Sequence, residues 1–146
     1  AKRYIFTMRF LGLDLGKKTI GVAISDETGL TGQPLTTIKR ASLTKDLEAI
    51  VKLIEEYSVE HIVAGMPVNM NGTIGPRGTA VEKFIGILRE RTGLPVTPWD
   101  ERLSTVAVER VLIDGDISRA RRREVIDKMA AAYILQGYLD GRRLAS

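Results

Sequence analysis

Runs of apolar residues with two different periods divide this chain into expected strands and helices. Short apolar runs bounded by turn residues predict β-strands, whereas apolar residues spaced three or four positions apart predict helices. Five strands are predicted, the last of them broken by Pro98, at residues 10–15, 19–25, 33–40, 61–66 and 95–101.

Four helices are predicted from the same pattern. Ser42 and Ser104 are suited to N-cap two of them, and Gly93 is placed to end another. A long loop of turn residues is expected at 67–78, and a basic loop at 114–123. The predicted helices cover residues 42–57, 79–93, 104–113 and 124–140.

The order of these elements predicts a single α/β domain over residues 8–140. Three successive strands favour an antiparallel meander, and the later alternation of strands and helices favours parallel strands with crossover helices. We therefore expect a five-stranded mixed sheet, its first three strands antiparallel, with helices on both faces. Residues 1–7 are interpreted as a leader or an expression-vector remnant, and residues 141–146 as a C-terminal tail.

Composition narrows the function classes. The 146 residues are 44% apolar and 27% charged, which is usual for a globular protein, and none is cysteine, which excludes disulfides and thiolate chemistry. No apolar run approaches the roughly 20 residues of a membrane span, so no membrane partner is expected. The net charge of +4 favours an anionic partner such as nucleic acid. A cytoplasmic location is expected.

Acidic residues from distant parts of the chain are the candidate catalytic residues. Asp14 lies inside the first predicted strand, and Asp100 and Glu101 end the fifth. Asp127 shares a helix face with small apolar residues, so it is expected to point inward. Buried carboxylates brought together need cations, and oxygen ligands suit Mg²⁺ or Mn²⁺. Two such ions can hydrolyse a phosphodiester. The acids are therefore expected to form a two-metal nuclease site.

Each of these acids also has a simpler interpretation. Asp14 can pair with Lys17 or Lys18 in the following turn, and Glu101 can pair with Arg102. Asp127 can be a carboxylate in the first turn of its helix, where the helix dipole favours negative charge.

Basic residues near the acids are candidates for binding nucleic acid. We expect the phosphate backbone to be approached by Lys17, Lys18, Arg77 and Arg102, and by Arg121 and Arg122 of the arginine cluster 119–123. The alternative for that cluster is a solvated loop. His61 is expected to be structural, and Trp99 to belong to the core rather than to stack on a base.

Four segments resemble the signature blocks of the YqgF (RuvX) family: GLDLGKKTIGVAISD, IVAGMPVNMNGTIGPRG, DERLSTVAVER and DKMAAAYILQGYLD. The resemblance implies an RNase H-like fold and a catalytic triad of Asp14, Glu101 and Asp127, with Glu101 preferred to Asp100. Its members are described as Holliday-junction resolvases and as nucleases that mature the 5′ end of pre-16S ribosomal RNA. Lys18 stands where arginine is common in the family, and Asn71 where aspartate is common.

These observations predict a metal-dependent nuclease, a hydrolase of ester bonds, that processes pre-16S rRNA in ribosome biogenesis. The alternatives are a Holliday-junction resolvase and a non-catalytic nucleic-acid-binding module. The first block also looks like the first phosphate motif of the sugar kinase and actin superfamily, but a single domain argues against an ATP-using enzyme. The expected partners are structured RNA or branched DNA, and a ribosome or pre-ribosome. The chain can act as a monomer or a homodimer.

Overall fold

The computed structural model describes residues 8–69, 71–101 and 119–145. Its five strands form one mixed sheet in the spatial order β3-β2-β1-β4-β5. The strands β1, β2 and β3 pair antiparallel, whereas β1 with β4 and β4 with β5 are parallel, as predicted. The strands are β1 (Phe10–Leu15), β2 (Thr19–Ser25), β3 (Gly32–Lys39), β4 (His61–Met66) and β5 (Val96–Asp100).

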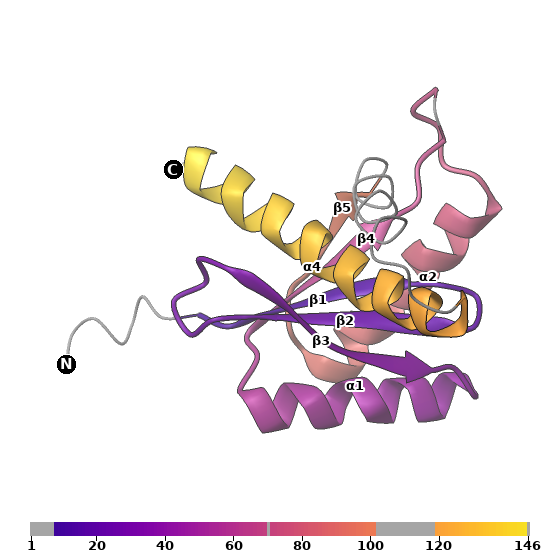
Figure 1. Cartoon of the computed structure of the whole chain (residues 1–146), viewed down its shortest axis with the longest axis horizontal. Helices are drawn as coiled ribbons and strands as arrows, with labels where there is room; N and C mark the ends of the chain where they lie inside the picture. The colour runs from indigo at the N-terminus through magenta and orange to yellow at the C-terminus, as the bar shows by residue number, and fades with distance from the viewer. Residues whose placement is uncertain (1–7, 70, 102–118, 146) are drawn as a thin grey trace.

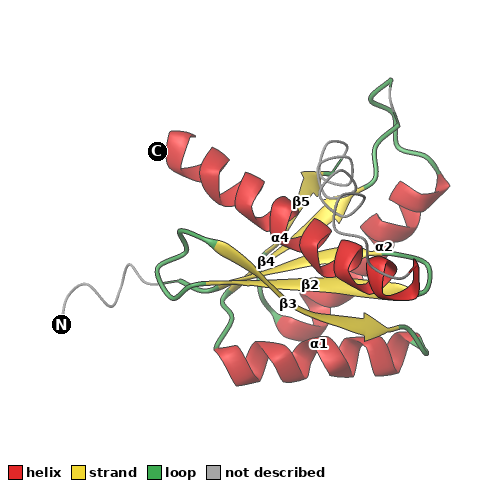
Figure 2. Cartoon of the chain, in the orientation of Figure 1, coloured by secondary structure: helices red, strands yellow, loops and turns green. Residues whose placement is uncertain are grey.

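Helices cover both faces of this sheet, which confirms the predicted architecture (Figures 1 and 2). Alternate residues of β1 point to opposite faces. Leu11, Leu13 and Leu15 pack with α1 (Leu43–Tyr57) and α2 (Pro76–Thr92). Phe10, on the other face, packs with α4 (Arg119–Ala145). By the same alternation Asp14 faces α4.

Several predicted boundaries are confirmed by the caps. The Ser42 hydroxyl accepts a hydrogen bond from the Lys45 N–H at 3.2 Å and N-caps α1. Gly93 ends α2 in the left-handed conformation, with φ at 70°. Helix α2 begins at Pro76, before the predicted start, because proline at the first helical position has no N–H to lose.

Other sequence expectations were wrong. Pro98 does not break β5, because β5 is an edge strand of the described sheet, where proline's missing N–H is tolerated. The arginine cluster 119–123 is the start of α4 rather than a loop, in keeping with the high helix propensity of arginine. Helix α4 also continues past Asp140 to Ala145. The helix predicted at 104–113 lies outside the described residues.

Glycines on the α4 side of the sheet let this helix lie directly on the strands. A Cβ at Gly12 would lie 2.8 Å from the Leu135 Cβ, and a Cβ at Gly21 would overlap the main-chain carbonyl of Asp127. Gly21 is the direct cross-strand neighbour of Asp14. The close approach at Gly21 therefore places Asp127 next to Asp14.

We expect Gly21→Ala to lower the free energy of unfolding by about 2–3 kcal/mol, because the new methyl group must push α4 off the sheet. Urea denaturation measures this. Gly86→Ala is the matched control, since a Cβ there meets nothing within 4 Å, and alanine should be neutral or stabilising in the middle of α2. Equal stabilities of the two variants would contradict this account of the contact.

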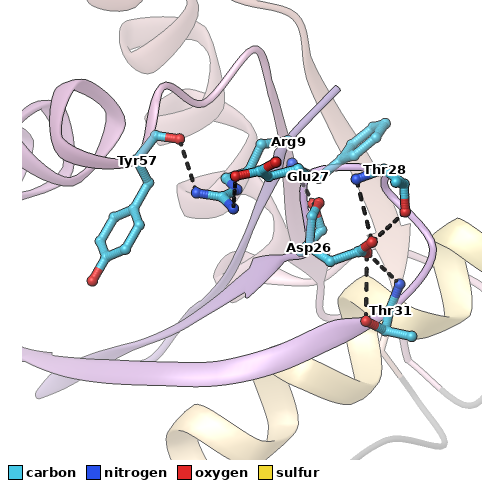
Figure 3. A network of polar contacts seen from close by, with 8 residues as sticks. Arg9, Asp26, Glu27, Thr28, Thr31 and Tyr57 are labelled. Atoms are coloured by element: carbon cyan, nitrogen blue, oxygen red, sulfur yellow. Dashed lines mark hydrogen bonds and ion pairs between the residues drawn. The ribbon is translucent and has the colours of Figure 1, made fainter. Parts of the chain in front are cut away.

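The turn between β2 and β3 is held by a polar network (Figure 3). The Asp26 carboxylate accepts hydrogen bonds from the N–H groups of Leu30 and Thr31, both at 2.8 Å. Slight burial opposes the charge, but hydrogen bonds from Thr28, Thr31 and Leu30 outweigh it and hold the Asp26 pKa well below its usual value. Asp26 follows the end of β2, whereas Asp14 pairs near the start of that strand, so this network stabilises the end of the sheet remote from the acids.

Candidate active site

Asp14 and Glu101 lie where the parallel strands β1, β4 and β5 reach their carboxyl ends. In open α/β sheets, ligands bind beside this edge. Asp14 is the penultimate residue of β1 and is half-buried. Glu101 directly follows β5 and is tied to β4 by its N–H, which donates to the Met66 carbonyl at 3.3 Å. A Cβ at Gly65 would lie 2.5 Å from Glu101 Oε2, so this glycine provides the space that the carboxylate occupies.

The side chains of Asp14 and Glu101 are close enough to hydrogen-bond to each other when one of the two carboxyl groups is protonated. Burial, followed by the negative charges of Glu101 and Asp127, raises the pKa of Asp14 from its usual 3.8 to about 8, although Arg77 opposes the shift. Burial also raises the pKa of Glu101, and the charge of Asp100 adds to this effect. Without a metal ion, burial and mutual repulsion therefore favour the protonated form of this pair.

Asp127, on α4, lies close enough to Asp14 for its charge to raise the pKa of Asp14. Its carboxylate accepts a hydrogen bond from the Thr19 hydroxyl at the start of β2. In the described part of the chain, no three acidic or histidine side chains are already gathered around one metal position. Asp14 and Glu101 bind each other, while Asp127 binds Thr19. Thr19 was not among the residues expected from the sequence, although strand alternation places it on the same face as Gly21 and Ala23.

The simpler interpretations of two acids were wrong. Asp14 forms no ion pair with Lys17 or Lys18, all three of which the structure describes. Asp127 lies beyond the first turn of α4, because the helix starts at Arg119, and the helix dipole acts mainly within the first turn.

Asp100 and Glu101 also differ in their surroundings, a comparison that the sequence left open. Asp100 is exposed, whereas Glu101 is half-buried and bonded to Asp14. Arg102, the alternative partner of Glu101, lies outside the described residues.

The predicted basic residues are placed unevenly around the acids. Arg77, on the first turn of α2, is close enough to lower the pKa of both Asp14 and Glu101. Lys17 and Lys18 are exposed in the turn between β1 and β2. Arg121 and Arg122 lie near the start of α4.

His61 and Trp99 are structural, as expected. The His61 ring packs against Phe10 at 5.0 Å between ring centroids, and its Nε2 hydrogen-bonds the Thr97 hydroxyl at 2.8 Å. Burial, aided by the nearby Arg142 charge, lowers the His61 pKa. Trp99 makes an edge contact with Tyr138, at 5.6 Å between ring centroids.

The fold and the paired carboxylates define an α/β domain with an acidic site at the carboxyl edge of its sheet. The family model described as "Holliday junction resolvase" (RuvX) matches residues 8–141. The chain belongs to the RuvX family. No helix within the described ranges is long and apolar enough to cross a bilayer.

Two curated relatives, both named "Putative pre-16S rRNA nuclease", match almost the full length of the chain. The one from Symbiobacterium thermophilum is 60% identical over 135 residues, covering 92% of this chain and 94% of the relative. The one from Desulfitobacterium hafniense is 57% identical over 133 residues, covering 91% and 92%.

Solved structures with low sequence identity share the fold. Thermus thermophilus RuvC in complex with a Holliday junction matches with a TM-score of 0.61 at 15% identity, covering 95% of this chain and 98% of that chain. The fowlpox virus resolvase with junction DNA matches with a TM-score of 0.55 at 16% identity, covering 92% and 99%. These matches support the RNase H-like architecture expected from the sequence.

Proposed function

We propose that this protein is a metal-dependent nuclease that hydrolyses phosphodiester bonds, with Asp14, Glu101 and Asp127 as its catalytic and metal-binding residues. The observation that carries the proposal is the contact between Asp14 and Glu101, two half-buried acids at the carboxyl ends of β1 and β5. Asp127 lies close enough for its charge to raise the pKa of Asp14. The proximity of these acids, which come from β1, the end of β5 and α4, supports the proposal because mutual repulsion makes such a grouping costly unless a cation binds there.

The donor set suits hard divalent cations. Carboxylate oxygens are the ligands that Mg²⁺ and Mn²⁺ prefer, and a cation would take the place of the proton that Asp14 and Glu101 share. When bound, a pair of such ions can activate water and stabilise the leaving oxygen of a phosphodiester. Asp14, Glu101 and Asp127 would hold the ions, and Thr19 would orient the Asp127 carboxylate.

The cationic side chains around the acids would hold the substrate. Arg77 lies close enough to Asp14 and Glu101 to lower the pKa of both, so it is suited to hold the substrate backbone beside the acids. Lys17 and Lys18 would bind flanking phosphates, as would Arg102, Arg121 and Arg122. Contacts of this kind position a nucleic acid without reading its sequence.

We infer that the substrate is the 5′ leader of pre-16S rRNA, because relatives of nearly equal length are named for that activity. This role would place the protein in the cytoplasm, in contact with a ribosome or pre-ribosome. Branched DNA is the second candidate, favoured by the family description. Symmetric junction cleavage would favour a homodimer, since two active sites must face paired strands, whereas a monomer suffices to process one RNA end.

Parallel cleavage of two labelled substrates tests this proposal. A pre-16S RNA leader and a mobile four-way DNA junction are each incubated with Mn²⁺, with Mg²⁺ and with EDTA. We expect the RNA leader to be cut with either metal and to remain intact in EDTA. If only the DNA junction is cut, the proposed substrate is branched DNA and not the RNA leader. Cleavage of neither by the pure protein, or by the protein with pre-ribosomal particles, would favour the binding module.

A further inference from the structure

A small basic cavity lies beside the proposed active site and is not explained by metal binding. Its volume is about 100 Å³, and its lining includes Leu15, Lys17, Arg40, Arg77, Val81 and Phe84. Pockets for drug-sized ligands occupy about 300–1,000 Å³, whereas one water takes about 30 Å³. This cavity is therefore matched in size to a single small group, such as an oxyanion.

Arg40 is held rigidly in the wall of this cavity. Its Nη1 donates to the Gly16 carbonyl at 2.8 Å, and its Nε donates to the Asp46 carboxylate at 3.2 Å. Asp46 is only 3% exposed and also accepts from the Ala41 N–H at 3.0 Å. No hydrogen bond from Nη2 of Arg40 is formed within the described ranges. The guanidinium is thus fixed in position and still has donors for a ligand.

The other charged groups of the cavity are two cations that form no ion pair among the described residues. Lys17 and Arg77 are both exposed and reach the cavity from different elements, the β1–β2 turn and α2. The centroid of the Phe84 ring lies 5.7 Å from the Arg40 guanidinium carbon. Its apolar surface reduces the local polarity, which strengthens the attraction between the cations and an anion.

Arg77 connects this cavity to the carboxylates. It lines the cavity and also lies within electrostatic range of Asp14 and Glu101. Leu15 and Gly16, which directly follow Asp14 in the chain, line the cavity as well. A phosphate in the cavity would therefore be a close neighbour of a phosphate at the acids.

We propose that Lys17, Arg40 and Arg77 form a binding site for one phosphate group of the nucleic acid, next to the phosphate that is cleaved. The proposal rests on the proposed nuclease function and names the subsite that fixes the substrate in register. The phosphate can be an internal phosphodiester or a terminal phosphomonoester. Arg40 is the new residue of this site, and its fork of N–H donors suits phosphate oxygens.

Binding measurements that require no cleavage test this subsite. The Asp14→Asn protein is titrated with short single-stranded RNA carrying a 3′ fluorophore, from about 50 to 200 mM salt, where phosphate contacts have strong effects. The same titration is made after adding Lys17→Gln or Arg40→Lys. Lys83→Gln is the matched control, because Lys83 is an exposed lysine that does not line the cavity.

We expect Lys17→Gln and Arg40→Lys each to weaken RNA binding roughly tenfold, as the loss of a charge-assisted hydrogen bond predicts. Lys17→Gln should also lower the slope of log affinity against log salt by about 0.7, the value for one phosphate contact on a single strand. Lys83→Gln should change neither quantity appreciably. Because Lys17 is exposed, its variant should fold even if Arg40→Lys is unstable.

The source of the phosphate is identified by comparing RNA with a 5′-phosphate and RNA with a 5′-hydroxyl. A loss of affinity for both RNAs supports an internal phosphodiester, whereas a loss confined to the 5′-phosphorylated RNA supports a terminal phosphomonoester. If Lys17→Gln and Arg40→Lys bind both RNAs as well as Lys83→Gln does, the subsite is wrong, even if the wild-type protein cleaves. If the wild-type protein cleaves nothing, the nuclease proposal fails while this binding result still applies.

Discussion

Replacing Asp14 with asparagine is expected to reduce metal-dependent cleavage by about a thousandfold or more. Metal ions contribute several kcal/mol to such a reaction, and each 1.36 kcal/mol corresponds to a tenfold change in rate. Asparagine keeps the size of Asp14 but loses the negative oxygen that a cation requires. Its amide can still donate a hydrogen bond to Glu101, so the fold should be preserved. Single-turnover cleavage of the preferred substrate measures the effect.

Matched variants at the end of β5 make this prediction specific. Glu101→Gln should lose about as much activity as Asp14→Asn, because both residues belong to the bonded pair. Asp100→Asn should keep most of the activity, since Asp100 is exposed. Wild-type cleavage by Asp14→Asn would refute the site. If Asp100→Asn loses activity and Glu101→Gln retains it, Asp100 rather than Glu101 is the metal ligand.

The metal-free protein is expected to become less stable as the pH rises from about 4 to about 8. Asp14 has a usual pKa of 3.8 and a folded pKa of about 8, so across this interval the folded state binds the proton more tightly than the unfolded state. Stability falls with pH wherever the folded state holds more protons. The expected loss is on the order of 5 kcal/mol, because the two pKa values differ by about four and each tenfold difference in proton affinity corresponds to about 1.36 kcal/mol. Urea denaturation in EDTA, at several pH values, measures it.

Asp14→Asn is the control that isolates this titration. Glu101, whose pKa is also raised by burial, adds to the same loss. His61 has the opposite effect on the pH dependence. Its lowered pKa means that the folded protein favours the neutral ring, so its contribution to stability is lost as the pH falls below about 6.5. Asp26 affects the stability only below its usual pKa of 3.8. Its folded pKa is lowered, so the ionised carboxylate stabilises the folded protein, and protonation at low pH removes this stabilisation. His61 and Asp26 remain in the variant, so the difference between the two proteins reports the Asp14–Glu101 pair. Equal pH dependence of the two proteins would show that Asp14 carries no shared proton.

Local patterns in the sequence predicted most elements of the fold. Strand alternation and helical spacing are properties of neighbouring residues, so β1, β2 and β4 were predicted with their observed limits. Ser42 and Gly93 were recognised because capping depends on the chemistry of one residue at a helix end. The three candidate acids were found in the same way, as carboxylates on apolar elements, and the resemblance to a family favoured Glu101 over Asp100.

Contacts between distant segments were decided only by the tertiary structure. The bond between Asp14 and Glu101 depends on β4 lying between β1 and β5, and the position of Asp127 depends on the glycine that lets α4 lie against β2. Thr19 and Arg40 carry no sequence signal of their own, because a threonine in a strand and an arginine after one are common. Their roles arise from the partners that folding brings to them. The sequence by itself therefore determined most of the elements and the candidate acids. The order of the strands and the packing of α2 and α4 on the sheet decided which acids meet and which cations line the cavity beside them.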